Sequence, residues 1–160
     1  MPTEPIWPLV HDKLIALLSG ISTANSTSYW YTVREVYEQM PATWDRAKIP
    51  AIVVQPAPGP TVRTYIGGSR TVSEELVFSL VAMVKDDQAD GIGKYRRASR
   101  LMADIHRAVY AEPNLGLTRV KRVLIPSGPE VSPGPDLSGT PLLQISAALL
   151  VQLAFEDSAP

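Results

Sequence analysis

The stretch MVKDDQADGIGKYRR, at positions 83–97, places acidic residues, two glycines and a lysine between an apolar run and a basic one. Calcium loops, dinucleotide-binding turns and phosphate-binding loops use such residues. A calcium loop counted from Asp86 needs a glutamate at its twelfth position, where this chain has Arg97. The dinucleotide pattern needs a glycine at Arg96, and the phosphate loop needs Ser or Thr after its lysine, where a tyrosine stands. Each motif fails at a residue that carries its chemistry, so the stretch is interpreted as a strand-to-helix turn with Asp90 as helix N-cap.

Other reactive residue types do not form a recognisable site. The two histidines, His11 and His106, are each predicted on a helix near the border of its apolar face, where a structural role is expected. Glu74 and Glu75 are neighbours on a predicted strand and therefore point to opposite faces. No serine stands in a nucleophile elbow, and the chain has no cysteine for thiol catalysis or disulfides. We predict no catalytic residue, no cofactor and no metal site.

Three arginines of one predicted helix, Arg96, Arg100 and Arg107, lie on the face opposite its apolar residues. This stripe could bind an anion or an acidic partner, or it could be a solvated face partly neutralised by Asp104. The aromatic run YWY at 29–31 could stack a base. Alternation along a strand, however, divides its rings between two faces and favours packing in the core.

The composition is that of one folded domain without a strong charge. The chain has 160 residues, of which 45% are hydrophobic and 19% charged, so it can bury a core and is not predicted to be disordered. Its formal net charge of −1 gives no general attraction to nucleic acid or membrane. No apolar run reaches the roughly 20 residues that cross a bilayer, and no signal-peptide pattern is present. These features predict a single domain over residues 1–160, in a soluble cytosolic protein.

Hydrophobic periodicity predicts two amphipathic helices, one from about Pro5 to Ser19 with Thr3 as its cap, and one from about Gly91 to Ala111. Alternating apolar and β-branched residues indicate strands, which are expected at 28–40, 50–56, 71–85, 118–125 and 142–156.

Two segments rich in proline and glycine separate these strands and are predicted to be flexible. The arm at 56–70 could form a hairpin in its middle. The loop at 126–141 holds five prolines and three glycines, and no regular element is expected there. The predicted fold class is α+β, a mostly antiparallel sheet with both helices packed on one face, in the order α-β-β-(arm)-β-α-β-(loop)-β.

This order of elements, with the texture of RLMADIHRAV and ISAALLVQLAFED, resembles the tail terminator proteins of long-tailed bacteriophages over roughly Ile6 to Glu156. These minor tail proteins cap the tail tube, and the family has no catalytic residues to carry over. The resemblance implies a hexameric ring of identical subunits at the head-proximal end of the tube, which stops tube growth and offers the head-joining surface. The implied partners are the tail tube protein and the head–tail connector proteins, with genome DNA only passing through the ring lumen.

The resemblance also implies a location at the tail–neck junction of the virion, after assembly in the host cytoplasm. Two alternatives stay open: a head-closure or neck connector protein, and, in a different class, a small enzyme or ligand-binding protein with an unrecognised pocket. The candidate partner contacts are Arg63, Tyr65, Arg70, Arg96, Arg100 and Arg107.

Overall fold

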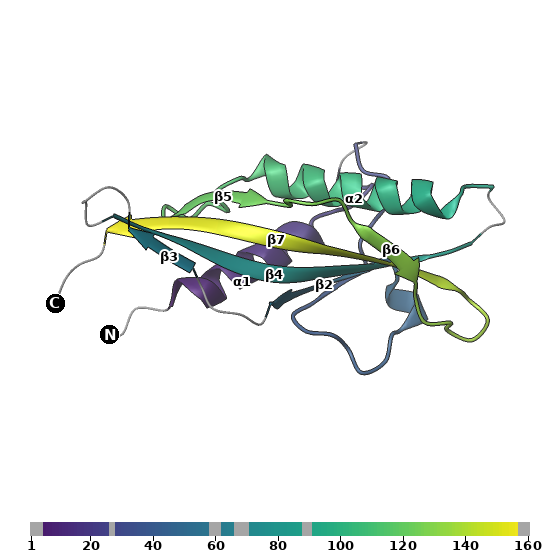
Figure 1. Cartoon of the computed structure of the whole chain (residues 1–160). Helices are drawn as coiled ribbons and strands as arrows, with labels where there is room; N and C mark the ends of the chain where they lie inside the picture. The colour runs from purple at the N-terminus through teal and green to yellow at the C-terminus, as the bar shows by residue number, and fades with distance from the viewer. Residues whose placement is uncertain (1–4, 26–27, 58–61, 66–70, 88–90, 157–160) are drawn as a thin grey trace.

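The computed structural model describes residues 5–25, 28–57, 62–65, 71–87 and 91–156. Within them the chain forms two α-helices, a short 3-10 helix and seven strands, which confirms the predicted α+β class (Figure 1). In chain order the elements are α1 (Ile6–Ser19), β1 (Glu35–Tyr37), the 3-10 helix (Arg46–Lys48), β2 (Ala51–Pro56), β3 (Val62–Tyr65), β4 (Thr71–Lys85), α2 (Lys94–Ala111), β5 (Val120–Leu124), β6 (Glu130–Pro133) and β7 (Leu142–Glu156).

The strands of the described chain form one mixed, mostly antiparallel sheet. β1 pairs in parallel with β2, and the path then runs antiparallel through β4 and β7 to β5. β3 pairs with the beginning of β4. β6 pairs with the beginning of β7, at the opposite end of the sheet. β4 and β7 are paired along fifteen residues each, from Thr71 opposite Glu156 to Lys85 opposite Leu142, and they form the long axis of the molecule (Figure 1).

The alternation of side chains along β4 decides which of them the helices cover. Leu76, Phe78 and Leu80 are at most 5% exposed and belong to the main core. Val77, between them in the sequence, is 41% exposed on the other face. Both faces of β4 carry apolar residues. Whether such a residue is buried is therefore decided by the helices that cover one face, and not by its type.

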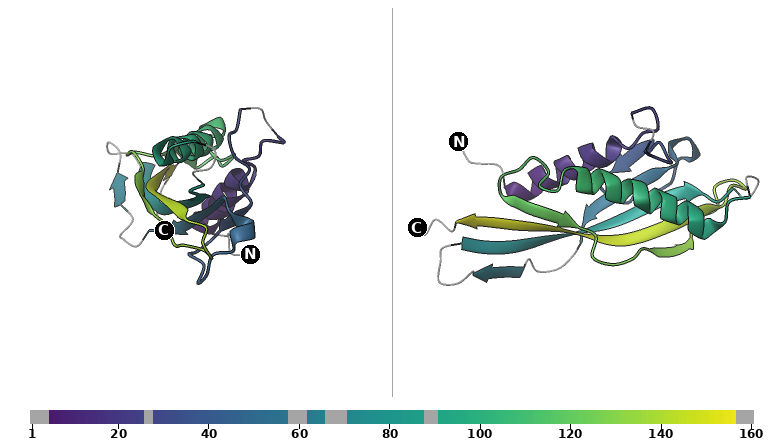
Figure 2. Two further views of the ribbon diagram at one scale, coloured as in Figure 1. Left: turned by 90° about the vertical axis from the view of Figure 1, so that its right-hand side faces the viewer. Right: turned by 90° about the horizontal axis from the view of Figure 1, so that it is seen from above.

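Both helices pack on the same face of the sheet, as predicted. α1 contributes Val10, Leu14 and Leu18 to the main core, and α2 contributes Leu101 and Ile105, all at helical spacing. The views in Figure 2 show the two helices next to each other over the sheet, and they are in contact. Neither helix in the described part of the chain has the length and hydropathy that crossing a membrane requires.

The predicted strand at 28–40 was too long, because only β1 within it pairs with a neighbour. Before β1, the backbone N–H groups of Trp30 and Tyr31 donate hydrogen bonds to the Asp104 carboxylate of α2. The Asp104 side chain therefore accepts the hydrogen bonds that these two N–H groups would otherwise donate to a neighbouring strand. Trp30 and Tyr31 are held by a side chain of α2 and not by backbone pairing with another strand.

The loop at 126–141 is more regular than predicted. β6 lies within it, and Leu137 and Thr140 exchange backbone hydrogen bonds of 3.0 and 3.1 Å across a tight turn. Ser138 and Gly139 between them have φ values of 53° and 80°, as a two-residue hairpin turn with the twist of β-strands requires. Prolines are compatible with β6 because an edge strand needs only one set of its N–H groups for pairing.

Two further predictions concern the arm and the start of the second helix. β3 lies in the arm at 56–70 and forms a hairpin with β4, as the sequence suggested. α2 begins at Lys94, later than predicted, and Gly93 occupies the N-cap position. Asp90, the predicted N-cap, and Thr3, the predicted cap of α1, lie outside the described residues.

Candidate functional site

The five predicted partner contacts that the structure describes lie on two separate elements, β3 and α2. Arg63 and Tyr65 lie in β3, at the end of the sheet far from the start of α2 (Figure 1). Arg70 lies outside the described residues. Arg96 is exposed in the first turn of α2, and the other two arginines of the predicted stripe lie further along that helix. The role of these residues in partner binding stays a prediction.

Two arginines of the predicted stripe contact aromatic side chains of the segment before β1. The guanidinium carbon of Arg100 lies 4.2 Å from the centre of the Trp30 ring, and that of Arg107 lies 5.9 Å from the centre of the Tyr29 ring. Arg107 also donates a hydrogen bond to the Ser28 carbonyl. Cations over aromatic faces attract the ring electrons, so these contacts help to hold the segment against α2.

Asp104 anchors the same segment from a buried position, which corrects its predicted place on a solvated face. Its residue exposure is 0%, and its carboxylate accepts hydrogen bonds from the N–H of Trp30 at 2.9 Å and of Tyr31 at 2.9 Å. Nη1 of Arg107 lies 3.5 Å from the same carboxylate. Burial raises the pKa of the Asp104 carboxyl, and the two backbone donors and the Arg107 charge oppose that rise.

The sequence contains a signal for this buried carboxylate. Asp104 follows Leu101 by three positions and precedes Ala108 by four, a spacing that places it on the buried stripe of α2. A charged residue on such a stripe needs partners inside the fold. Which partners it finds depends on a segment more than seventy residues away in the chain.

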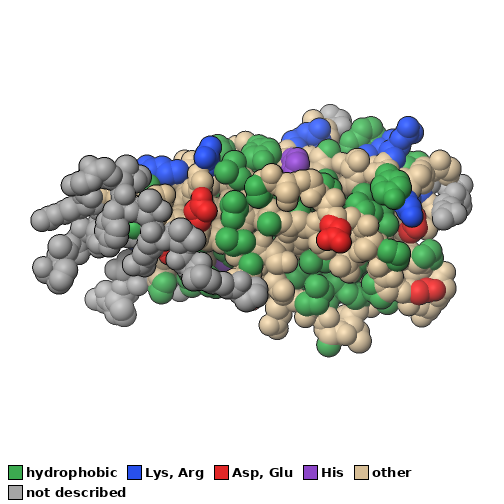
Figure 3. All heavy atoms as spheres, in the orientation of Figure 1, with side chains coloured by type: hydrophobic (Ala, Val, Ile, Leu, Met, Phe, Trp, Pro, Cys, Tyr) green, Lys and Arg blue, Asp and Glu red, His purple; other side chains and the backbone are tan. Residues whose placement is uncertain are grey.

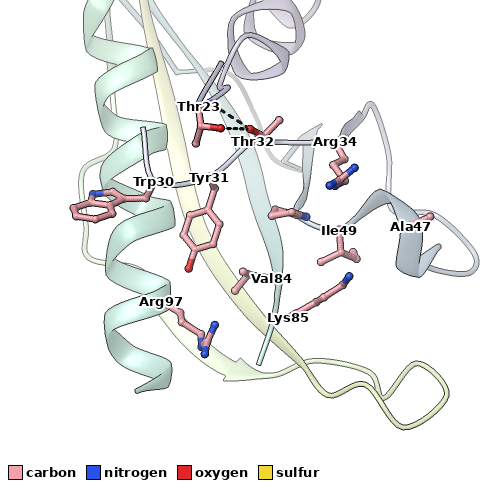
Figure 4. A pocket seen from close by; sticks show the side chains of 11 residues that line it. Thr23, Trp30, Tyr31, Thr32, Arg34, Ala47, Ile49, Val84, Lys85 and Arg97 are labelled. Atoms are coloured by element: carbon pink, nitrogen blue, oxygen red, sulfur yellow. Dashed lines mark hydrogen bonds between the residues drawn. The ribbon is translucent and has the colours of Figure 1, made fainter. Parts of the chain in front are cut away.

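A cleft of about 640 Å³ opens where the segment before β1, the residues before β2, the end of β4 and the first turn of α2 meet (Figure 4). Three cations from three of these elements surround it: Arg34, Lys85 and Arg97. Among the described residues that line the cleft there is no Asp or Glu. Lys85 also lines a neighbouring hollow together with Asp86 and Asp87, so carboxylates lie close to the cleft.

The three cations are held in different ways. Arg97 is only 5% exposed and donates a hydrogen bond to the Asp87 carbonyl, so its guanidinium group is fixed in position at the edge of the cleft. The backbone N–H of Arg34 donates to the Pro50 carbonyl at 2.8 Å, which fixes where its exposed side chain leaves the backbone. Lys85 is the last residue of β4 and is half-buried.

Hydroxyl and apolar groups complete the lining of the cleft. The hydroxyls of Thr23 and Thr32 lie 2.9 Å apart and are joined by a hydrogen bond (Figure 4). Tyr31, Ile49 and Val84 contribute apolar surface beside them. This set of groups can bind an anion that is attached to a partly apolar molecule. The sequence reasoning missed the cleft because its cations come from separate segments that share no local pattern.

Neither histidine lines the cleft, and Glu74 and Glu75 do not line it either. Nε2 of His11 hydrogen-bonds the Val54 carbonyl at 2.6 Å, and the His106 ring lies 5.7 Å from the Tyr110 ring. Both histidines are half-buried. Glu75 accepts a hydrogen bond from Nε2 of Gln152 at 2.9 Å. No group of three or more His, Asp or Glu suited to a metal ion occurs within the described ranges.

Comparison with known protein families finds none that matches this chain, and a search of curated proteins finds no match either.

Proposed function

We propose that this protein is a tail terminator subunit of a long-tailed bacteriophage. Six copies form a ring that caps the tail tube, ends its polymerisation and joins the finished tail to the head through connector proteins. The first support for this proposal is the order of elements along the chain, from α1 through the β3 hairpin to the long β7 strand. The predicted order on which the resemblance rests treats β3 as part of an arm and has no strand at β6.

The observation that carries the proposal is the unequal covering of the sheet. α1 and α2 cover one face, whereas Val77 on the other face is 41% exposed and Leu150 opposite it is half-exposed. In Figure 3 hydrophobic side chains gather over the middle of the molecule, and charged ones are sparse there. A partly apolar sheet face without a helix layer is suited to contact with a neighbouring subunit.

The outer strands offer a second kind of contact. Within the described residues β3 pairs with β4 alone, and β6 pairs with β7 alone. Their outer edges carry N–H and C=O groups that a strand of a neighbour can bind. Since the two edges lie at opposite ends of the sheet, contacts through them would be head-to-tail, and head-to-tail contacts close into rings when the rotation permits.

The decisive experiment deletes the gene in the native phage and images the lysate by electron microscopy. We expect tails longer than normal and filled heads without tails, because tube growth would have no stop and no joining surface. A plasmid copy of the wild-type gene should restore normal particles. Tails of normal length attached to heads in the deletion lysate would contradict the proposal.

The same complementation assay tests the sheet face that carries Val77 and Leu150 and that the helices leave uncovered, called the open face below. A plasmid copy with Val77→Arg should fail to restore tails, because a charge would be buried between subunits, while the purified variant keeps its fold. Ser99→Ala, at an exposed position of α2, is the matched control and should restore them. Full restoration by Val77→Arg would remove this face from the ring contacts.

The neck connector is the second candidate, and the same lysate separates it from the terminator. A connector acts after the tail has been completed, so its loss would leave tails of normal length that are not attached to heads.

A further inference from the structure

Trp30 is the aromatic residue of the segment before β1 whose ring does not join the core. Tyr29 and Tyr31, on either side of it, pack against the main core, whereas Trp30 is 56% exposed and belongs to neither core cluster of the described chain. The backbone N–H groups of Trp30 and Tyr31 donate to the buried Asp104 carboxylate, so the backbone that carries the exposed ring is fixed in position. Exposed tryptophans that are already held in place are well suited to be central contacts of a protein interface, because little ordering is needed on binding.

The Trp30 ring also positions a guanidinium group. The guanidinium carbon of Arg100 lies 4.2 Å from the centre of the ring. Guanidinium groups stack flat on aromatic rings, an arrangement that leaves their in-plane N–H donors available for other acceptors. Within the described residues the Arg100 side chain has no hydrogen bond and no ion pair beside this ring contact. Arg100 is therefore held in place while its hydrogen-bonding groups are unused.

The two segments that surround Arg100 offer it no exposed carboxylate. Residues 20–34 contain no Asp or Glu, and Asp104 is the only acidic residue of α2. Asp104 is 0% exposed and already accepts from two backbone N–H groups and pairs with Arg107. The acidic residues at 86–90 precede α2, and Arg100 lies roughly 9 Å further along the helix axis than the first residue of α2. A carboxylate that pairs with Arg100 therefore has to come from another molecule.

The number of available cations favours a protein over a nucleic acid as the source of the anion. A single guanidinium can bind one carboxylate through two parallel hydrogen bonds. Binding to nucleic acid needs several phosphate contacts, and Arg107, the other arginine in contact with this segment, is already paired with Asp104. The formal net charge of the chain, −1, adds no general attraction to phosphates.

We propose that Trp30 and Arg100 form a docking patch for an acidic segment of another protein. A glutamate of that segment pairs its carboxylate with the Arg100 guanidinium and packs its methylene groups on the exposed part of the Trp30 ring. The patch lies within one subunit, so the proposal does not depend on the ring described above. In a tail terminator the acidic segment would belong to a protein that docks on the ring.

The test titrates a hexaglutamate peptide into the isotope-labelled full chain at low ionic strength and follows the indole N–H signals of the three tryptophans by NMR. The Trp30 signal, assigned by its loss in Trp30→Phe, should shift until it saturates, and the signals of Trp7 and Trp44 should stay in place. Hexaglutamine at the same concentrations is the matched peptide without charge and should cause no shift. Added salt should weaken the binding, because an exposed pair is screened.

Three variants test which property of Arg100 matters. Arg100→Gln should raise the dissociation constant of hexaglutamate by about tenfold, because the carboxylate loses its charged partner. Arg100→Lys keeps the charge but loses the planar pair of donors, and it should raise the constant by about threefold. The control Arg119→Gln removes an exposed cation just before β5 and should change the constant by less than about twofold.

Several results would overturn the proposal: no saturable shift of the Trp30 signal, the same response to hexaglutamine, or equal weakening by Arg100→Gln and Arg119→Gln. Tighter binding of a single-stranded oligonucleotide, lost in Arg100→Gln, would assign the patch to nucleic acid instead. If Arg100→Gln does not fold, Arg100→Lys carries the test, and an unchanged affinity in that variant would count against the paired hydrogen bonds on which the proposal rests.

Discussion

The two faces of the sheet are built by the same strands but differ in what covers them. On the helix-covered face, α1, α2 and alternate residues of β2, β4 and β7 form the main core. On the open face, a smaller cluster around Val53, Val81 and Met83 lies at one end of the sheet, with Trp44 and Leu137 packed against it. The comparison shows that an apolar strand residue is buried only where another layer reaches it.

The adjacent residues Val77 and Phe78 of β4 show this difference most clearly. Phe78 is 1% exposed and packs with the helices, and its ring lies 6.2 Å from that of Trp7 in α1. Val77 is 41% exposed on the open face. Hydrophobic stabilisation follows the apolar area removed from water, so the two faces should respond very differently to truncation.

The largest effect is expected for Ile105→Ala on the covered face. Ile105 is fully buried between α2 and the sheet, and its truncation leaves a cavity that the packed core cannot fill. The free energy of unfolding, measured in urea, should fall by about 2–5 kcal/mol. Ser99→Ala on the exposed side of the same helix is the control and should change it little. A loss below about 0.5 kcal/mol for Ile105→Ala would mean that α2 does not cover the sheet as described.

A smaller loss is expected for Asp104→Ala, which tests how the segment before β1 is held against the covered face. The substitution leaves the N–H groups of Trp30 and Tyr31 without their acceptor and Arg107 without its carboxylate. Unfolding free energy should fall by about 1–3 kcal/mol, and Asp104→Asn should lose less because its amide oxygen can still accept. Hydrogen exchange at Trp30 and Tyr31 is the local measurement. Unchanged protection in Asp104→Ala would contradict the anchoring role.

Comparing wild type with Asp104→Asn at different pH values shows how the charge state of Asp104 changes the free energy of unfolding. Burial raises its pKa in the folded state above the ordinary value of 3.8, so the folded protein binds the proton more tightly than the unfolded chain does. The resulting stabilisation is complete below 3.8 and is lost as the pH rises through the folded-state pKa. Wild type should therefore gain stability relative to Asp104→Asn as the pH falls toward 3.8. The opposite trend would show that Arg107 and the backbone donors outweigh burial.

The smallest effect is expected on the open face, in a matched pair of valines. Val151 of β7 is fully buried under the helices, whereas Val77 of β4 is exposed. Val151→Ala should cost about 1.5–3 kcal/mol of unfolding free energy in the isolated subunit, and Val77→Ala less than about 1 kcal/mol. Equal costs would mean that a further layer covers the open face even in the free protein.

Much of the fold could be predicted from the sequence because its longest elements are strongly periodic. The limits of β4 and β7, and the apolar stripe of α2 around Leu101 and Ile105, follow from local alternation and helical spacing. The prediction was wrong where long-range contacts decide the local structure. The residues before β1 have strand-like composition, but their donors bind Asp104, and β6 forms in a proline-rich loop because β7 lies beside it.

The candidate site could not be predicted in the same way. Arg34, Lys85 and Arg97 follow no motif, and each would pass as an ordinary surface cation in the sequence. The stripe that the sequence did indicate, by contrast, has two of its arginines in contact with Trp30 and Tyr29.

The sequence by itself determined the types and order of the long elements and the two apolar faces of the long strands, because these depend on side-chain periodicity within a single segment. Only the tertiary structure decided that Asp104 is buried and that three distant cations share one cleft. Those outcomes depend on contacts between segments far apart in the chain, and no local pattern records which of the competing contacts has the lowest free energy.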